Sequence, residues 1–135
     1  MKIEINQTYT EDLLFSQQDV IDFAKVSGDD NPVHLDAEFA AKTQFLKPIM
    51  HGMISGCVFS KVMGTKFPGY GSIYLGQTIE FKRPMFVDVA YRAVFTAISI
   101  NPEKHRAEIK CEIFDKETQK LTTSGIATVM NLERF

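Results

Sequence analysis

The chain has 135 residues, of which 44% are hydrophobic and 24% charged, and its formal net charge is −2. These values are typical of one globular domain, which we expect to span residues 1–135. The small negative charge and the absence of a basic run argue against binding to nucleic acid or to an anionic membrane surface. The N-terminal segment has no signal-peptide pattern and no run has membrane-span length, so we expect a cytoplasmic protein.

The sequence contains few residues that could form a metal site or a disulfide. The two cysteines, Cys57 and Cys111, are too few for a disulfide framework or a four-cysteine zinc site, and we expect both to be buried thiols. Histidine, cysteine and acidic residues do not occur at zinc-ligand spacings. We therefore expect neither a metal ion nor a cofactor.

Two helices are predicted in the first third of the chain. Ser16 stands three residues before Asp19, a pattern that resembles a capping box. An apolar face at helical spacing follows, and Gly28 can end this helix. A second, short helix is predicted for residues 37–45, with Asp36 as its N-cap.

The stretch "HGMISGCVFSKVMG", residues 51–64, predicts a longer central helix. Because it is apolar around most of its circumference, we expect it to be buried on most sides. Gly56 and Gly64 lower its intrinsic helix propensity. Close approach of another backbone segment would explain both glycines.

The second half of the chain has the alternating pattern of β-strands. Long strands are predicted at residues 72–82, 90–100, 105–115 and 121–132, and the stretches "NPEK" and "DKETQK" are hairpin connections. Sequential strands of this kind form an antiparallel sheet that needs cover on one face. The sequence therefore predicts an α+β fold, an antiparallel sheet wrapped around the central helix.

The stretch "SGDDNPVHLD", residues 27–36, contains an acid and an imidazole five positions apart, Asp29 and His34. On an α-helix their side chains would diverge by about 140°, and on a strand they would face opposite sides. Pro32 and Gly28 favour an irregular segment, in which the two can converge. A carboxylate and an imidazole that converge can hold one water and move its protons.

Gly52 lies at the expected first turn of the central helix. The first N–H groups of a helix lack partners, and a glycine there lets a ligand oxygen come close, as in an oxyanion hole. A held water and a polarised carbonyl together suit water addition to a conjugated alkene. Taken singly, an Asx turn, a loop histidine and an entry glycine are each more often structural.

The stretch "FAKVSGDDNPVHLDAEFA", residues 23–40, resembles the hydratase-2 signature of the MaoC-like (R)-specific enoyl-CoA hydratases. "PIMHGM" and "GSIYLGQTIEFKRPMFV" are also similar to that family. The resemblance implies a hot-dog fold, a homodimer whose sheets join edge to edge, and an acyl-CoA substrate. It further implies reversible syn hydration of trans-2-enoyl-CoA to (R)-3-hydroxyacyl-CoA.

The same resemblance assigns site residues. It implies that Asp29 and His34 hold the catalytic water, although which is base and which is acid stays open, and that the backbone of Gly52 donates to the thioester oxygen. His51 receives no catalytic role, because a structural hydrogen bond is the simpler expectation.

Three further residues are expected on the substrate side of the site. Asn31 orients the loop or a partner of the acid–imidazole pair. Ser60 and Met63 lie near the tunnel that limits acyl-chain length in the family. Ordinary helix packing explains Ser60 and Met63 equally well.

Other functions remain open at this point. A 3-hydroxyacyl-acyl carrier protein dehydratase would use the same chemistry on a different carrier. A thioesterase would need water directed at C1 instead of C3. A non-catalytic acyl-CoA-binding module needs neither Asp29 nor His34. Chain-length preference and pathway are not indicated by the sequence.

Overall fold

The computed structural model describes residues 1–135. Its elements in chain order are β1 (Thr8–Leu13), α1 (Gln17–Ser27), α2 (Pro32–Leu35), α3 (Ala37–Ala41), α4 (Gly52–Thr65), β2 (Ile73–Gln77), β3 (Glu80–Phe81), β4 (Tyr91–Asn101), β5 (Arg106–Asp115) and β6 (Leu121–Met130). None of these helices combines the length and apolarity that crossing a bilayer requires.

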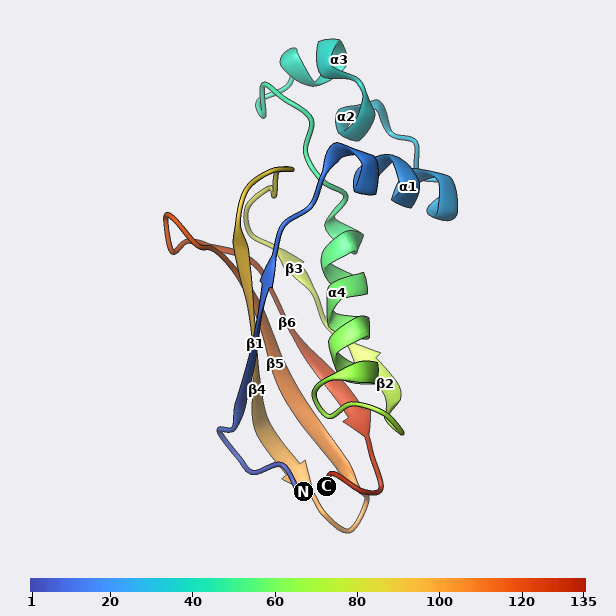
Figure 1. Ribbon diagram of the computed structural model, residues 1–135, viewed down its shortest axis with the longest axis vertical. Coiled ribbons are helices and arrows are strands. Elements are labelled where there is room, and N and C mark those ends of the chain that lie inside the picture. Colours follow the sequence, from blue (N-terminus) through green and yellow to red (C-terminus); the bar gives the residue numbers. More distant parts are fainter.

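One antiparallel sheet carries the fold. Its strand order is β1-β4-β5-β6-β2, and β3 also pairs with β6. The sheet curves, and α4 runs along it while α1, α2 and α3 gather at one end (Figure 1). The predicted α+β arrangement of an antiparallel sheet around a central helix is confirmed.

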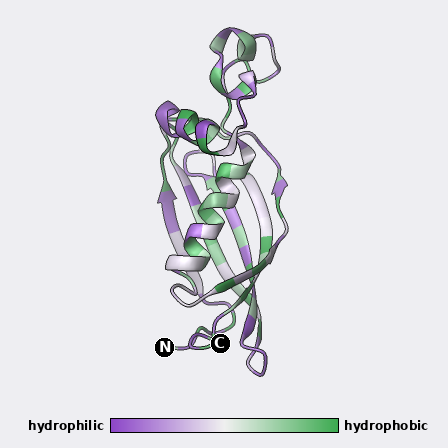
Figure 2. Cartoon of the chain, turned by 90° about the vertical axis from the view of Figure 1, so that its right-hand side faces the viewer, coloured by the Kyte–Doolittle hydropathy of each residue, from purple (hydrophilic) through white to green (hydrophobic).

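The core lies between α4 and the sheet. Figure 2 shows the alternation of hydrophobic and hydrophilic residues along the strands behind this helix. Phe59 of α4 is fully buried and meets Phe95 of β4 edge to face, with ring centroids 5.9 Å apart. One continuous cluster of 22 buried residues, including these two, holds the helix against the sheet.

The helix ends follow their local signals. Ser16 and Asp19 form the predicted capping box, and Gly28 ends α1 in the left-handed conformation with φ 77°. Asp36 caps α3 as expected. This helix ends earlier than predicted, at Ala41, because the Thr43 hydroxyl donates to the Ala40 carbonyl and closes a turn there.

Two elements were missed at the sequence level. β1 pairs with β4 along its whole length, but only alternate residues of β1 are covered and one of these is Glu11, so its apolar pattern is weak. α2 is a single turn, too short for a periodic signal. His34 therefore lies on a helical turn and not in the purely irregular segment that we expected.

The strand predicted for residues 72–82 is two strands, because Thr78 lies over Gly125 of β6. A Cβ atom on Gly125 would lie 1.9 Å from the Thr78 carbonyl oxygen. The Thr78 N–H donates to the Ile126 carbonyl at 2.9 Å, and the Ile126 N–H donates to the Thr78 hydroxyl. This crossing interrupts the pairing and redirects β3 toward the start of α4.

The surroundings of α4 correct three expectations. The helix is buried on one face only, since Met53, Cys57 and Ser60 are exposed in this chain. A Cβ on Gly56 would meet only the Met53 side chain, and one on Gly64 would meet nothing within 4 Å, so no backbone approaches either glycine. Of the two thiols, Cys111 is buried and Cys57 is exposed.

We predict that Gly125→Ala lowers the free energy of unfolding by about 1–3 kcal/mol, because the new methyl group must displace the Thr78 carbonyl. Gly76→Ala is the matched control in β2, since its Cβ would meet nothing within 4 Å. Urea unfolding of both variants measures the difference. Equal unfolding free energies for the two would show that the crossing at Gly125 is not tightly packed.

Candidate active site

The segment between α1 and α2 positions Asp29 and His34 through local hydrogen bonds. The Asp29 carboxylate accepts from the Asn31 N–H at 3.3 Å, and the Asn31 side chain accepts from the Val33 N–H at 3.2 Å. Asn31 is thus the N-cap of α2, and Pro32 occupies the first turn, where its missing N–H costs nothing. One helical turn then places His34 facing inward, 8% exposed.

The tautomer of His34 follows from its partner. Its Nδ1 lies 2.7 Å from the Ile49 carbonyl oxygen, which can only accept, so Nδ1 carries the proton. In the neutral ring, Nε2 therefore has a free lone pair. Burial lowers the pKa of His34, as does neighbouring His51, while the Ile49 hydrogen bond and the Asp29 charge act in the opposite direction.

His51 is buried, 3% exposed, at the N-cap of α4. Its Nε2 lies 2.8 Å from the Asp29 carbonyl oxygen and must donate to it. The ring lies against His34, with centroids 4.0 Å apart and an interplanar angle of 32°, and meets Phe23 edge to face. The structural hydrogen bond expected for His51 is present, but its Nδ1 is buried without a hydrogen-bond partner.

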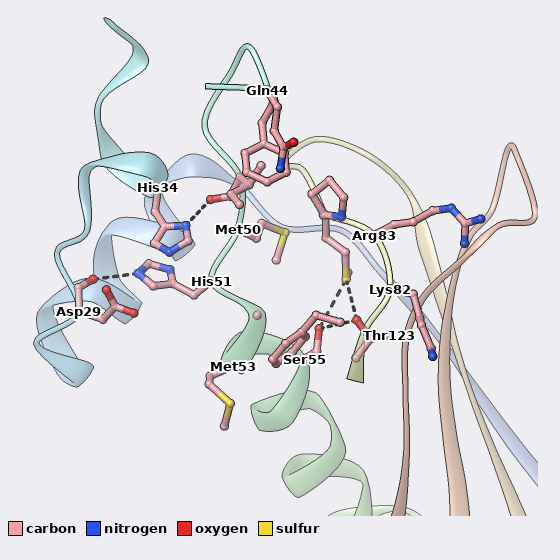
Figure 3. Close-up of a pocket in the computed structure, with 16 residues that line it drawn as sticks. Asp29, His34, Gln44, Met50, His51, Met53, Ser55, Lys82, Arg83 and Thr123 are labelled. Atoms are coloured by element: carbon pink, nitrogen blue, oxygen red, sulfur yellow. Dashed lines mark hydrogen bonds between the residues drawn. The ribbon is translucent and has the colours of Figure 1, made fainter. Parts of the chain in front are cut away.

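Asp29 and His34 converge, as predicted from the irregular backbone around Gly28 and Pro32, and His51 joins them from a later part of the sequence (Figure 3). One donor or acceptor atom of each residue lies within 4.8 Å of the corresponding atoms of the other two. Atoms no more than 4.8 Å apart can all lie within about 2.8 Å of one point, an ordinary hydrogen-bond distance for a water. The cluster can therefore hold one water molecule.

The same three residues are also the types that bind metal ions, which the sequence spacing did not indicate. A tetrahedral zinc with Zn–N bonds of about 2.1 Å would hold two imidazole centres roughly 5 Å apart. The rings of His34 and His51 are closer, at 4.0 Å. As they stand, they suit a water better than a tetrahedral metal ion.

The N-terminus of α4 supplies the second half of the site. No side chain caps this end of the helix, and the N–H groups of Gly52 and Met53 have no acceptor within it. The Phe81 ring of β3 packs on Gly52 so closely that a Cβ there would come within 2.8 Å of it. Only glycine leaves space between this ring and the helix.

A cavity of about 510 Å³ connects the two halves. Asp29, His34, His51 and Gly52 line it, and Lys82 and Arg83 lie along its wall (Figure 3). This volume is in the range of sites for small ligands.

Three of the residues assigned to substrate lie outside this cavity. Asn31 is exposed and acts through the loop instead, Ser60 is exposed on α4, and Met63 is 1% exposed within the core. In the single chain, the buried hydroxyls at the cavity come instead from Ser55 and Thr123, whose oxygens are 3.4 Å apart. No sequence motif marked that pair.

The sheet wrapped around one long helix, with its site at the head of that helix, defines a hot-dog fold. Residues 2–125 match the model of the MaoC like domain family, and the chain belongs to that family.

Curated relatives and a solved structure are similar to the chain over most of its length. The chain is 40% identical over 127 residues, 94% of both sequences, to an (R)-specific enoyl-CoA hydratase of Aeromonas caviae. It is 36% identical over 117 residues to an (R)-specific enoyl-CoA hydratase of Rhodospirillum rubrum, covering 85% of this chain and 78% of the relative. The solved structure of the (R)-hydratase from A. caviae superimposes with a TM-score of 0.91, covering 96% of this chain and 97% of that one.

We predict that the His34 ring titrates with a midpoint below 6.5, the ordinary histidine value, because burial disfavours the charged form. NMR of the imidazole Cε1–H signal, assigned with His34→Gln, measures this midpoint. Since the folded pKa is lowered, neutral His34 contributes stability above the ordinary pKa, and that stability is lost as pH falls through the folded value. A midpoint at or above 6.5 would contradict the burial argument.

Proposed function

We propose that this protein is an (R)-specific enoyl-CoA hydratase, a hydro-lyase that adds water reversibly to trans-2-enoyl-CoA and forms (R)-3-hydroxyacyl-CoA. The observation that carries the proposal is the convergence of Asp29 and His34 on a cavity whose other wall is an uncapped helix N-terminus at Gly52. The names of the two relatives and the match over 94% of both sequences with the A. caviae relative support the same activity.

In the proposed reaction, the thioester oxygen accepts from the Gly52 N–H, which draws electron density away from C3. The water held by Asp29 and His34 adds through its oxygen to C3 as one of its O–H bonds breaks. The released proton goes to the Asp29–His34 pair, and one proton passes from the pair to C2. The pair ends with the proton count that it had at the start, so the reaction needs no cofactor and no metal.

The carrier is proposed to be coenzyme A. Lys82 and Arg83 along the cavity give an anionic carrier a cationic contact, although Lys82 is also paired with Glu80. An acyl carrier protein presents the same phosphopantetheine chemistry, so a 3-hydroxyacyl-acyl carrier protein dehydratase is the second candidate. Comparison of rates on matched CoA and carrier-protein substrates separates the two.

We also propose that the protein is a cytoplasmic homodimer. β2 has a free edge, and the exposed face of α4 carries Met53 at 56% exposure and Cys57, so an apolar surface is available for a second copy. An acyl chain that extends beyond the cavity would then reach Ser60 at that interface. A monomer mass in analytical ultracentrifugation would contradict the dimer.

We predict that Asp29→Asn and His34→Ala each reduce crotonyl-CoA hydration by about 10²–10⁴-fold, as expected when one acid–base group is lost. The loss of enoyl absorbance measures the rate, and chiral analysis of the wild-type product should give the R alcohol. Circular dichroism at equal protein concentration verifies the fold.

His105→Ala is the control, because His105 bonds the Phe135 carbonyl at the opposite end of the sheet from the cavity. Undiminished hydration in both Asp29→Asn and His34→Ala would remove the assignment. Acyl-CoA binding by a wild-type protein without turnover would favour the binding module.

We predict that Gly52→Ala reduces the turnover number by about 10²-fold, because a methyl group beside Phe81 obstructs the oxygen-binding N–H. Gly64→Ala in the same helix is the matched control, since its Cβ meets nothing within 4 Å and alanine favours the helix. Wild-type turnover in Gly52→Ala would place the thioester elsewhere.

A further inference from the structure

His51 makes two different contributions through its two ring nitrogens. Nε2 donates to the Asp29 carbonyl and so ties the loop that carries the acid to the start of α4. Because Nε2 holds the proton, Nδ1 of the neutral ring is an acceptor, and it is buried without a partner in the protein. A buried acceptor without a hydrogen bond is unfavourable, so a ligand that satisfies it is stabilised.

The position of His51 restricts what that ligand is. The residue lines the same cavity as Asp29 and His34, and one polar atom of each lies within 4.8 Å of the other two. The His51 ring also lies against the His34 ring, so a molecule that bonds Asp29 and His34 together lies beside His51. The smallest molecule that does so is the water that the proposed hydration consumes.

We propose that Nδ1 of His51 is a third contact of the reacting water, an inference that rests on the proposed function. A water offers two hydrogens and two lone pairs in a tetrahedral arrangement. Contacts with Asp29, His34 and His51 occupy three of these directions, and the remaining lone pair points into the cavity toward C3. Two contacts alone would leave the water free to rotate about the line that joins them.

Three contacts to one water also restrict how many protons the side chains carry. Ionised Asp29 and neutral His34 and His51 would present three acceptors to a water that donates only two hydrogens. All three contacts form when one of the side chains is protonated and donates to the water oxygen. That protonated group is the acid required at C2, and an unprotonated member takes the proton released by the water.

Two substitutions separate the contributions of the two nitrogens. In His51→Gln, the amide nitrogen takes the place of Nε2 and keeps the bond to Asp29, but no acceptor remains at Nδ1. In His51→Asn, the amide oxygen takes the place of Nδ1, while the bond to the Asp29 carbonyl is lost. A structural role for His51 predicts that His51→Gln is the more active variant, whereas a water contact predicts the reverse.

The test is steady-state hydration of crotonyl-CoA by the full-length protein in buffer that contains EDTA. We expect the turnover number of His51→Gln to fall about 10–100-fold with KM nearly unchanged, because the water is misplaced and the thioester contacts are kept. We expect His51→Asn to be at least about five times faster than His51→Gln. His105→Asn, the same substitution at the far end of the sheet, should match the wild type.

Thermal unfolding of each variant shows whether the variant is folded. If His51→Asn does not fold, the turnover number of His51→Gln alone tests the water contact. If His51→Gln does not fold, the turnover number of His51→Asn tests it instead. A wild-type rate in His51→Gln, or a rate at least equal to that of His51→Asn, would overturn the water contact while leaving the hydratase intact. An inactive wild-type protein with folded variants would instead overturn the proposed function.

Discussion

The hydrogen bond from the His51 ring to the Asp29 carbonyl joins two segments that are 22 positions apart in the chain. One segment carries the acid and the imidazole, and the other begins the helix whose free N–H groups face the cavity. The acid-bearing loop is exposed, and apart from this bond it is held mainly by its own turns. The proposed chemistry depends on it, because water and carbonyl must meet across a fixed distance.

Local signals predicted much of the fold. Helices were predictable because their signals are local: the capping box at Ser16, the left-handed Gly28 and the apolar stretch of α4 each span only a few residues. The sequential hairpins were predictable from the alternation of apolar residues and from the turn residues. The missed or altered elements depend on tertiary contacts. β1 has a pattern too weak to recognise until β4 pairs with it, and the division of β2 from β3 is imposed by Thr78 crossing a glycine on β6.

The site was predictable where the backbone excluded alternatives. Asp29 and His34 could converge only outside a long helix or strand, and Gly28 and Pro32 supplied that irregularity. His51 could not be found in this way, since its contact with His34 arises when α2 and α4 pack together. The position of His51 directly before Gly52 was the available signal, but of these two residues only Gly52 was predicted to have a functional role.

The Phe81 ring beside Gly52 controls how a ligand reaches the N-terminus of α4. The ring is 53% exposed and belongs to a two-residue strand that is itself fixed by pairing with β6. Access to the helix terminus can thus change by rotation about side-chain torsions, a picosecond-to-nanosecond event, with the backbone at rest. Such a side-chain rotation is far faster than typical turnover, so in the proposed reaction the chemical step or product release would limit the rate.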